Sequence, residues 1–219
     1  MNHLRGINSD GKSNMENNLR EETQNTQALL SNRIWRTKGS RFNACRRLER
    51  KNGTLTFVTS CSSIHLLAIG IIQLTNLIDI TKHQSDWLSF ISIILSIIIL
   101  AHSLHENGKE HSLKSQRHHS CGIELDRCYS KLQYASDSEV KEISEEYNKI
   151  TEKYLLNHET IDDLYFQLQN PNDFPLIASR SRFGKNKIKL SYKYGDIIIA
   201  TMFVVIPLVV SLSVMIFGN

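Results

Sequence analysis

Two histidines next to a cysteine form the most reactive-looking cluster in the sequence. His118 and His119 precede Cys121, and Cys128 follows on the same face of a predicted helix. These residue types bind zinc, but their spacing matches no established zinc motif, and a single helix presents only two or three ligands on one side. We therefore interpret the cysteines as small packing residues and predict no metal site and no cofactor.

The other groups that could act in catalysis are incomplete. His105-Glu106 begins a His-Glu-x-x-His pattern, but the second histidine is missing. Asp162 and Asp163 are adjacent, so on a helix their side chains diverge by about 100°, which favours a surface or capping role. The sequence also lacks a phosphate-binding glycine loop, a Gly-x-Ser-x-Gly elbow and a Cys-x-x-Cys pair. We predict that the protein is not an enzyme.

Three apolar stretches dominate the chain. Residues 54–78, 87–104 and 197–217 contain no Asp, Glu, Lys or Arg, and each is long enough to cross or nearly cross a bilayer as a helix. In water such helices would leave apolar surface uncovered, whereas in lipid their own backbone hydrogen bonds satisfy every polar group. The sequence therefore predicts transmembrane helices at these positions, with a tight turn at 79–86 that makes the first two a hairpin.

Polar residues form stripes within the first two predicted spans. His65 and Asn76 lie on nearly the same side of the first span, and four serines share one side of the second. Polar groups at this depth need partners, so they either hydrogen-bond between helices or line a pore. The candidate pore-lining or interhelical residues are His65, Asn76, Ser89, Ser92, Ser96 and Ser103.

Basic residues define the predicted orientation. Lys and Arg are dense before 54–78 and again before 197–217, whereas the turn at 79–86 contains only Lys82. Because Lys and Arg near the ends of spans resist translocation, we expect a cytoplasmic N-terminus, a cytoplasmic segment at 109–194, and an outside C-terminus. The formal charge of +4 is then explained by anionic lipid, and we expect no direct binding of nucleic acid.

The cytoplasmic segment shows two heptad-like faces joined by a short turn. This pattern predicts an antiparallel helical hairpin, and core packing is its simplest explanation. Apolar surface beyond what a lone hairpin covers would also suit assembly of several copies. The candidate assembly face contains Cys121, Leu125, Cys128, Leu132, Val140, Ile143, Tyr147, Ile150 and Tyr154.

The remaining segments are shorter. We expect residues 1–33 to be a disordered cytoplasmic N-terminus, because they contain few large apolar residues. An amphipathic basic helix at 41–51 should lie at the membrane surface and lead into the first span. A short helix is expected at 160–169, followed by a basic linker and the third span within 172–219. The fold class is thus an all-α membrane protein: a transmembrane helical hairpin, a cytoplasmic helical hairpin at 105–170 and a C-terminal third transmembrane helix.

Residues 34–171 resemble the SLATT family, the two-transmembrane effector domains of SMODS and SLOG systems. The likeness is carried by Arg46-Arg-Leu-Glu-Arg50 before the hairpin, by the Ile/Leu/Ser-rich second span, and by its extension Glu110 to His119. Tyr147-Asn-Lys-Ile150, Asn157-His158 and Ile161-Asp162 look like a second cytoplasmic motif of the family.

The resemblance implies a function. Such a protein would be a membrane effector of a bacterial anti-phage defence system that forms an oligomeric pore in the inner membrane when triggered. The trigger would be a nucleotide signal or a partner protein, and a nucleotide-producing enzyme or a reverse transcriptase would be encoded nearby. The alternative is a non-conducting membrane anchor that recruits a cytoplasmic defence enzyme. The third span departs from the two-span pattern of the family.

Overall fold

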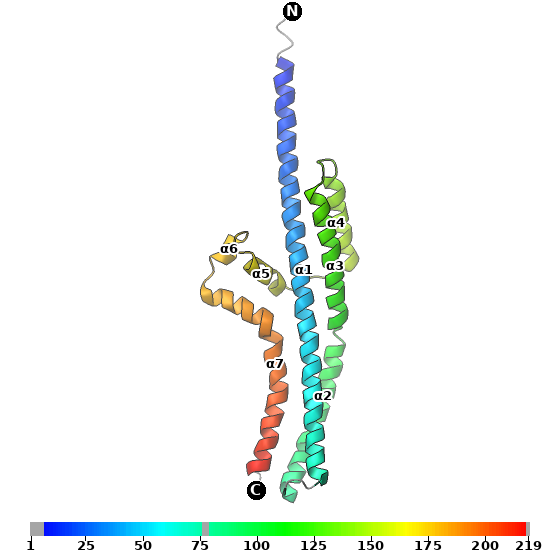
Figure 1. The fold of residues 1–219 in the computed structure, drawn as a ribbon, viewed down its shortest axis with the longest axis vertical. Helices are drawn as coiled ribbons and strands as arrows, with labels where there is room; N and C mark the ends of the chain where they lie inside the picture. Colours follow the sequence, from blue (N-terminus) through cyan, green and yellow to red (C-terminus); the bar gives the residue numbers. More distant parts are fainter. Residues whose placement is uncertain (1–6, 76–78, 218–219) are drawn as a thin grey trace, which may run out of the picture. The chain divides into compact units, whose positions relative to one another are not determined.

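The computed structural model describes residues 7–75 and 79–217 and is helical throughout them, with no strand in these ranges (Figure 1). The helices are α1 (Ile7–Thr75), α2 (Lys82–Asn107), α3 (His111–Gln133), α4 (Val140–Tyr154), α5 (Thr160–Gln169), α6 (Pro175–Ala178) and α7 (Arg182–Phe217). The chain divides into two compact units, which are treated separately below. Unit 1 contains residues 1–45 and 116–178, and unit 2 contains residues 46–115 and 179–219.

Unit 1 is a helical bundle with an ordinary apolar core. α3 and α4 form the antiparallel hairpin that the heptad spacing predicts, and α1 packs beside it (Figure 1). Leu30 and Ile34 of α1 complete the core. The predicted helix at 160–169 is confirmed as α5. It packs on α1 through Phe166, whose ring lies 4.8 Å from that of Trp35 and so close to Gly39 that a Cβ there would overlap it.

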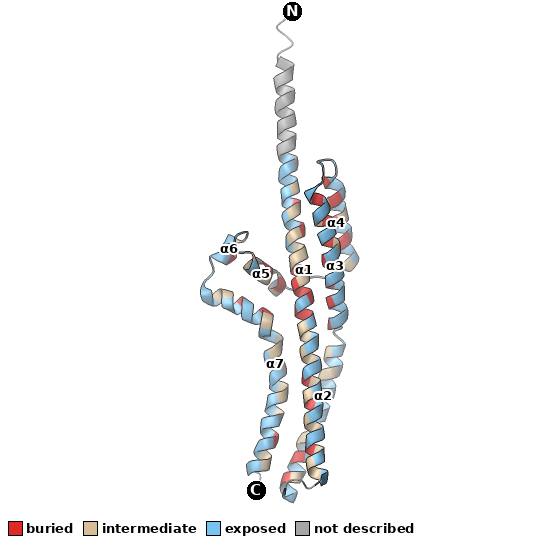
Figure 2. Ribbon diagram, viewed as in Figure 1, coloured by how far each residue is buried: buried red, intermediate tan, exposed pale blue. Residues whose placement is uncertain are grey.

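Unit 2 contains the last part of α1, all of α2, the first residues of α3, and α7. Its apolar side chains mostly face outward, as the pale blue helices of Figure 2 show, while Ser62, Gln84 and Ser211 are buried. α2 begins with a capping box in which Thr81 and Gln84 bond each other's backbone. Two stretches, Gln24–Thr75 and Lys82–Gln133, contain a segment long and apolar enough to cross a membrane, and Thr201–Phe217 is a shorter apolar helix.

The start of the chain differs from expectation. Disorder was expected to extend to residue 33, but α1 is helical from Ile7, and its side chains make specific contacts from residue 26 onward. Gln27 donates a hydrogen bond to the backbone oxygen of Leu132 at 2.9 Å, and Leu30 is buried. The sparse apolar residues here suffice because the α3–α4 hairpin supplies the rest of the core, which composition alone does not reveal.

The basic helix expected at 41–51 is the middle of α1 and continues directly into the first apolar stretch. Arg41, Asn43 and Cys45 are buried within unit 1. Burial therefore extends around more of this helix than the apolar spacing indicates, and its position at a membrane surface stays a prediction.

Candidate functional site

A polar contact links α1 with α7 inside the apolar stretches of unit 2. Nε2 of His65 lies 3.1 Å from Oγ of Ser211, and Ser211 is buried. Which of the two atoms donates depends on the tautomer of the histidine. Because each group would otherwise face an apolar environment without a partner, the contact favours the arrangement in which these helices are closed on each other.

Three further hydrogen bonds connect α2 with α1 and with α7 near the turn between α1 and α2. Nε2 of Gln73 donates to the backbone oxygen of Ser85 at 2.9 Å and to Oγ of Ser89 at 3.0 Å. Nε2 of Gln84 donates to the backbone oxygen of Met215 at 3.2 Å. Thus α1 is bonded to α2 through the half-buried Gln73, and α2 is bonded to α7 through the buried Gln84.

The remaining serines of the predicted stripe bond within their own helix. The hydroxyls of Ser92 and Ser96 donate to the backbone oxygens of Leu88 and Ser92 at 2.8 and 2.7 Å. Nδ2 of Asn107 lies 3.5 Å from Oγ of Ser103. Hydroxyls satisfied in this way can face lipid or water at little cost. Asn76 lies outside the described residues.

A charged cluster follows immediately after the apolar part of α2. Glu106 accepts hydrogen bonds from Lys109 and from Nε2 of His111 at 3.1 Å, and its carboxylate lies 4.0 Å from Nζ of Lys51 on α1. Burial by itself would raise the pKa of Glu106, but these cationic and hydrogen-bonding neighbours lower it to about 2. The cluster joins α1 to the start of α3.

The same cluster surrounds a break between helices. α2 ends at Asn107, and Glu110 has a φ of 52°, in the left-handed region that residues with side chains rarely adopt. α3 then starts at His111. Between the two helices, the N–H groups of Lys109 and Glu110 donate to the backbone oxygens of Glu106 and Asn107, three residues earlier, at 3.1 and 3.2 Å. The α-helical hydrogen-bond pattern is therefore interrupted at these two residues.

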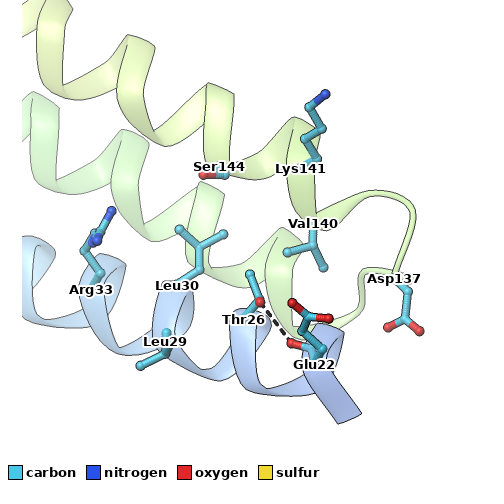
Figure 3. Close-up of a pocket in the computed structure, with 9 residues that line it drawn as sticks. All are labelled: Glu22, Thr26, Leu29, Leu30, Arg33, Asp137, Val140, Lys141 and Ser144. Atoms are coloured by element: carbon cyan, nitrogen blue, oxygen red, sulfur yellow. Dashed lines mark hydrogen bonds between the residues drawn. The ribbon is translucent and has the colours of Figure 1, made fainter. Parts of the chain in front are cut away.

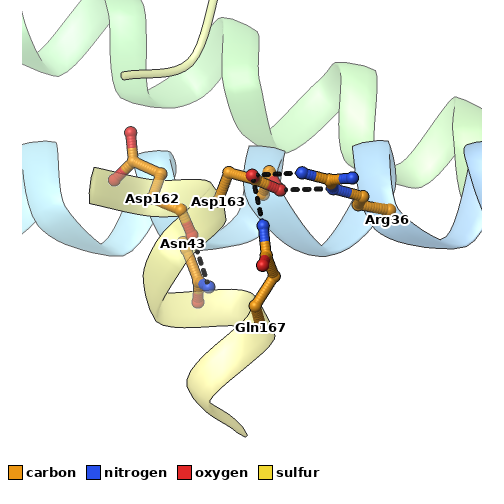
Figure 4. Close-up of polar contacts among 6 residues, drawn as sticks. Arg36, Asn43, Asp162, Asp163 and Gln167 are labelled. Atoms are coloured by element: carbon orange, nitrogen blue, oxygen red, sulfur yellow. Dashed lines mark hydrogen bonds and ion pairs between the residues drawn. The ribbon is translucent and has the colours of Figure 1, made fainter. Parts of the chain in front are cut away.

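A polar junction connects α5 with α1 in unit 1, and Figure 4 shows Asp163 between Arg36 and Gln167. Arg36 donates two hydrogen bonds to the carboxylate of Asp163, at 2.7 and 2.6 Å. Although burial alone would raise the pKa of Asp163, Arg36 and its other neighbours hold it below its usual value. Nδ2 of Asn43 donates to the backbone oxygen of Asp162 at 3.2 Å. These contacts hold the start of α5, which includes Asp162 of the Ile161-Asp162 motif, against α1.

Arg41 is the least compensated charge in unit 1. Its side chain is buried, Nη1 lies 3.4 Å from Nδ1 of His118, and Nε has no partner. Desolvation lowers its pKa, and in the described part of the chain no carboxylate pairs with it. A buried cation without a counter-ion is costly, so Arg41 is expected to contribute little to the stability of unit 1.

An open groove lies on unit 1 between α1 and the start of α4, with a volume of about 550 Å³ (Figure 3). Leu29, Leu30 and Val140 form its apolar floor, and the basic residues Arg33 and Lys141 also line it. Thr26 bonds the backbone oxygen of Glu22 at one end, at 2.9 Å. Its size and mixed lining suit a peptide segment or a small polar ligand.

The residues predicted as an assembly face are used within the chain. Tyr154 is half-buried, and the other members line the core of unit 1 against α1. They pack there with Leu30 and Ile34 of α1, and their part in assembly stays a prediction. The buried members are Cys121, Leu125, Cys128, Leu132, Val140, Ile143, Tyr147 and Ile150.

The cysteines are all free thiols. Burial raises the pKa of Cys121, and that of Cys128 to about 11, so neither is a thiolate at neutral pH. His118 is directed to Arg41, and the ring of His119 packs on Phe42. Among the described residues, no three His, Cys, Asp or Glu side chains are grouped to hold a metal ion.

The sequence pointed to His65 but missed Ser211, Gln84 and Lys51 as partners. Each could have been noticed as a polar residue within or beside an apolar run. The helix that each residue contacts could not be predicted, because a periodic pattern shows which side of a helix is buried but does not identify the neighbouring helix.

The described residues form an all-helical fold with two helices long and apolar enough to cross a membrane, which is typical of a membrane protein. A family model described as SMODS and SLOG-associating 2TM effector domain family 5 matches residues 23–215. The chain belongs to this SLATT family. It is therefore a membrane effector of a conflict or defence system, of the two-transmembrane type and not of a known catalytic family. Searches of curated proteins and of solved structures found no significant match.

Proposed function

We propose that this effector assembles from several copies in the bacterial inner membrane and opens a pore when its cytoplasmic helices are rearranged. The first two apolar stretches and α7 cross the membrane, with unit 1 and the N-terminus in the cytoplasm and the C-terminus outside. The lopsided distribution of Lys and Arg supports this orientation. The trigger is a nucleotide signal or a partner protein from the SMODS and SLOG systems with which the family associates.

The observation that carries the proposal is that α1 is one unbroken helix from Ile7 to Thr75. It contributes Leu30 and Ile34 to the core of unit 1 and His65 to the contact with Ser211. A helix transmits rotation along its length because its hydrogen bonds resist twisting. A ligand or partner that turns the cytoplasmic part of α1 therefore also moves His65, and the contact between α1 and α7 is the point at which the resting state is held.

The conducting path is assigned to the serine side of α2 and to the polar side of α1. In the resting state His65 and Gln73 are occupied by Ser211 and Ser89. When the pore opens, the side chains of His65 and Gln73 leave these serines and form hydrogen bonds with water. No fixed charge lies in 54–78 or 87–104, so the pore should discriminate poorly between ions. The isoleucines of 93–99 can close it by excluding water.

Dye-loaded liposomes containing the purified full chain test this function. His65→Ala and Ser211→Ala remove the contact that holds the resting state, so each should leak without a trigger. Ser96→Leu removes a pore-lining hydroxyl and should reduce leakage of triggered protein. Ser213→Ala is the matched control, because Ser213 bonds only the backbone of its own helix, at 2.8 Å to Val209. Tight liposomes for every variant and trigger would contradict the pore.

The groove of Figure 3 favours a second candidate, a non-conducting anchor that recruits a defence enzyme. An anchor needs a docking surface on unit 1 but no change in the spans. Leu29→Glu places a charge on the groove floor at an exposed position, where it should block recruitment without unfolding unit 1. Loss of defence by Leu29→Glu with liposomes that never leak would support the anchor, whereas unchanged defence would exclude the groove.

A further inference from the structure

The first part of α7 has two apolar sides, and only one of them is covered. On the covered side, Ile188 and Tyr192 are buried in unit 2. Nη2 of Arg50 donates to the backbone oxygen of Tyr192 at 3.0 Å, and its guanidinium carbon lies 4.6 Å from the centre of the tyrosine ring. These contacts fix the rotation of α7 about its axis.

The opposite side is then held outward. Phe183 is 80% exposed and Leu190 55% exposed, and Tyr194 is also exposed. Together with Lys187 they recur at spacings of 4, 3 and 4 residues, which places all four on one side of the helix. We call these four residues the outer stripe. A shallow groove of about 640 Å³ runs along it.

The charge around the outer stripe has one sign. Residues 174–195 contain no Asp or Glu, and their cations are Arg180, Arg182, Lys185, Lys187, Lys189 and Lys193. An exposed apolar row flanked by lysines is typical of a helix that lies in a membrane interface. The apolar helix Thr201–Phe217 follows directly in the same α7. Figure 1 shows α7 bent between these two parts.

We propose that residues 182–194 of α7 bind the surface of a bilayer that carries anionic headgroups. Phe183, Leu190 and Tyr194 enter the acyl boundary, and the lysines contact lipid phosphates. The stripe is poorly suited to a second copy of the chain, because two copies would bring like charges together. The inference depends on the proposed entry of α7 into the membrane, since this keeps the segment near the headgroups.

The test uses the full chain reconstituted in phosphatidylcholine vesicles, with or without phosphatidylglycerol, and one cysteine at a time labelled with an environment-sensitive fluorophore. Leu190→Cys reports on the outer stripe. Ser191→Cys, exposed one residue away and turned about 100° around the helix, is the control. Val209→Cys reports separately on whether the apolar part of α7 enters the bilayer.

Spin-labelled lipid should quench the fluorophore at Leu190→Cys several-fold more than at Ser191→Cys, and more strongly in the anionic vesicles. Lys187→Glu should weaken the preference for anionic vesicles at least about fivefold, the value for one lysine near a charged surface. Quenching at Val209→Cys without quenching at Leu190→Cys would contradict only the binding of residues 182–194 to the bilayer surface. If neither position were quenched, the proposed crossing of the membrane by α7 would be contradicted as well. A disulfide between Leu190→Cys residues of two copies, without lipid quenching, would assign the stripe to a second copy.

Discussion

Unit 1 and unit 2 differ in how many of their large apolar side chains remain exposed, although each also buries both apolar and polar residues. In unit 1, Leu125 has no exposed surface, and charged pairs such as Lys131–Glu146 lie outside. In unit 2, Leu67 is 67% exposed and Ile97 63%, whereas Ser211 is only 3% exposed. Both are stable helical arrangements because they face different solvents. Water drives apolar side chains inward, whereas lipid leaves packing and polar contacts to hold helices together.

The largest effect on the stability of unit 1 is expected at Leu125. Leu125→Asp places an unpaired charge in the core of unit 1 and should cost about 4 kcal/mol of folding free energy. Thermal unfolding and protease resistance of the detergent-solubilised chain would measure the loss. Ile123→Asp, on the same helix and partly exposed, is the matched control. A normal unfolding temperature for Leu125→Asp would mean that this face is not a core.

A charge introduced at an exposed position distinguishes a surface that faces lipid from one that faces water. Ile97→Asp lies on the outside of α2 and should cost about 3 kcal/mol of insertion free energy if that side faces lipid. Tyr134→Asp is 89% exposed on unit 1 and should change stability by less than about 0.5 kcal/mol. Membrane fractionation after carbonate washing compares them. Equal recovery of both variants in the membrane would contradict lipid exposure of α2.

The Glu106 cluster should give unit 2 a dependence on acid. The folded pKa of about 2 lies below the ordinary 4.5, so the stabilisation is complete above about pH 4.5 and is lost as the pH falls toward 2. Glu106→Gln should remove about 1–2 kcal/mol at neutral pH and flatten this acid dependence. Helix content followed from neutral to acid pH measures both. Glu110→Gln, exposed and outside the cluster, should keep the native profile; identical profiles for all three would rule the cluster out.

The smallest effect is expected at Arg41, and it has the opposite sign. Arg41→Met replaces a buried cation by an apolar side chain of similar length and should stabilise unit 1 by about 1 kcal/mol. Arg46→Met, exposed on the same helix, should be neutral. Thermal unfolding would compare the two. Destabilisation by Arg41→Met would show that the guanidinium is better satisfied than its single contact at 3.4 Å suggests.

The sequence predicts what depends on helical period and fails where neighbours matter. The core sides of α3 and α4, the bounds of α5 and the break after α2 follow from spacing and punctuation. The helix before residue 34 was missed because Leu30 is the one described residue there that joins the core, which is too little to suggest order without α3 and α4 beside it. His65 was recognised as needing a partner, but a one-dimensional pattern could not identify Ser211.

The topology of unit 2 is tested most directly by labelling engineered cysteines with a membrane-impermeant reagent in intact cells. The native Cys121 and Cys128 are buried, so the reagent should label them weakly. Labelling of the chain without engineered cysteines measures this background. The proposed topology places Asp86 and Phe217 outside and Ser138 in the cytoplasm, so Asp86→Cys and Phe217→Cys should be labelled in intact cells and Ser138→Cys only after the membrane is opened. Labelling of Ser138→Cys in sealed cells, or protection of Asp86→Cys, would contradict it.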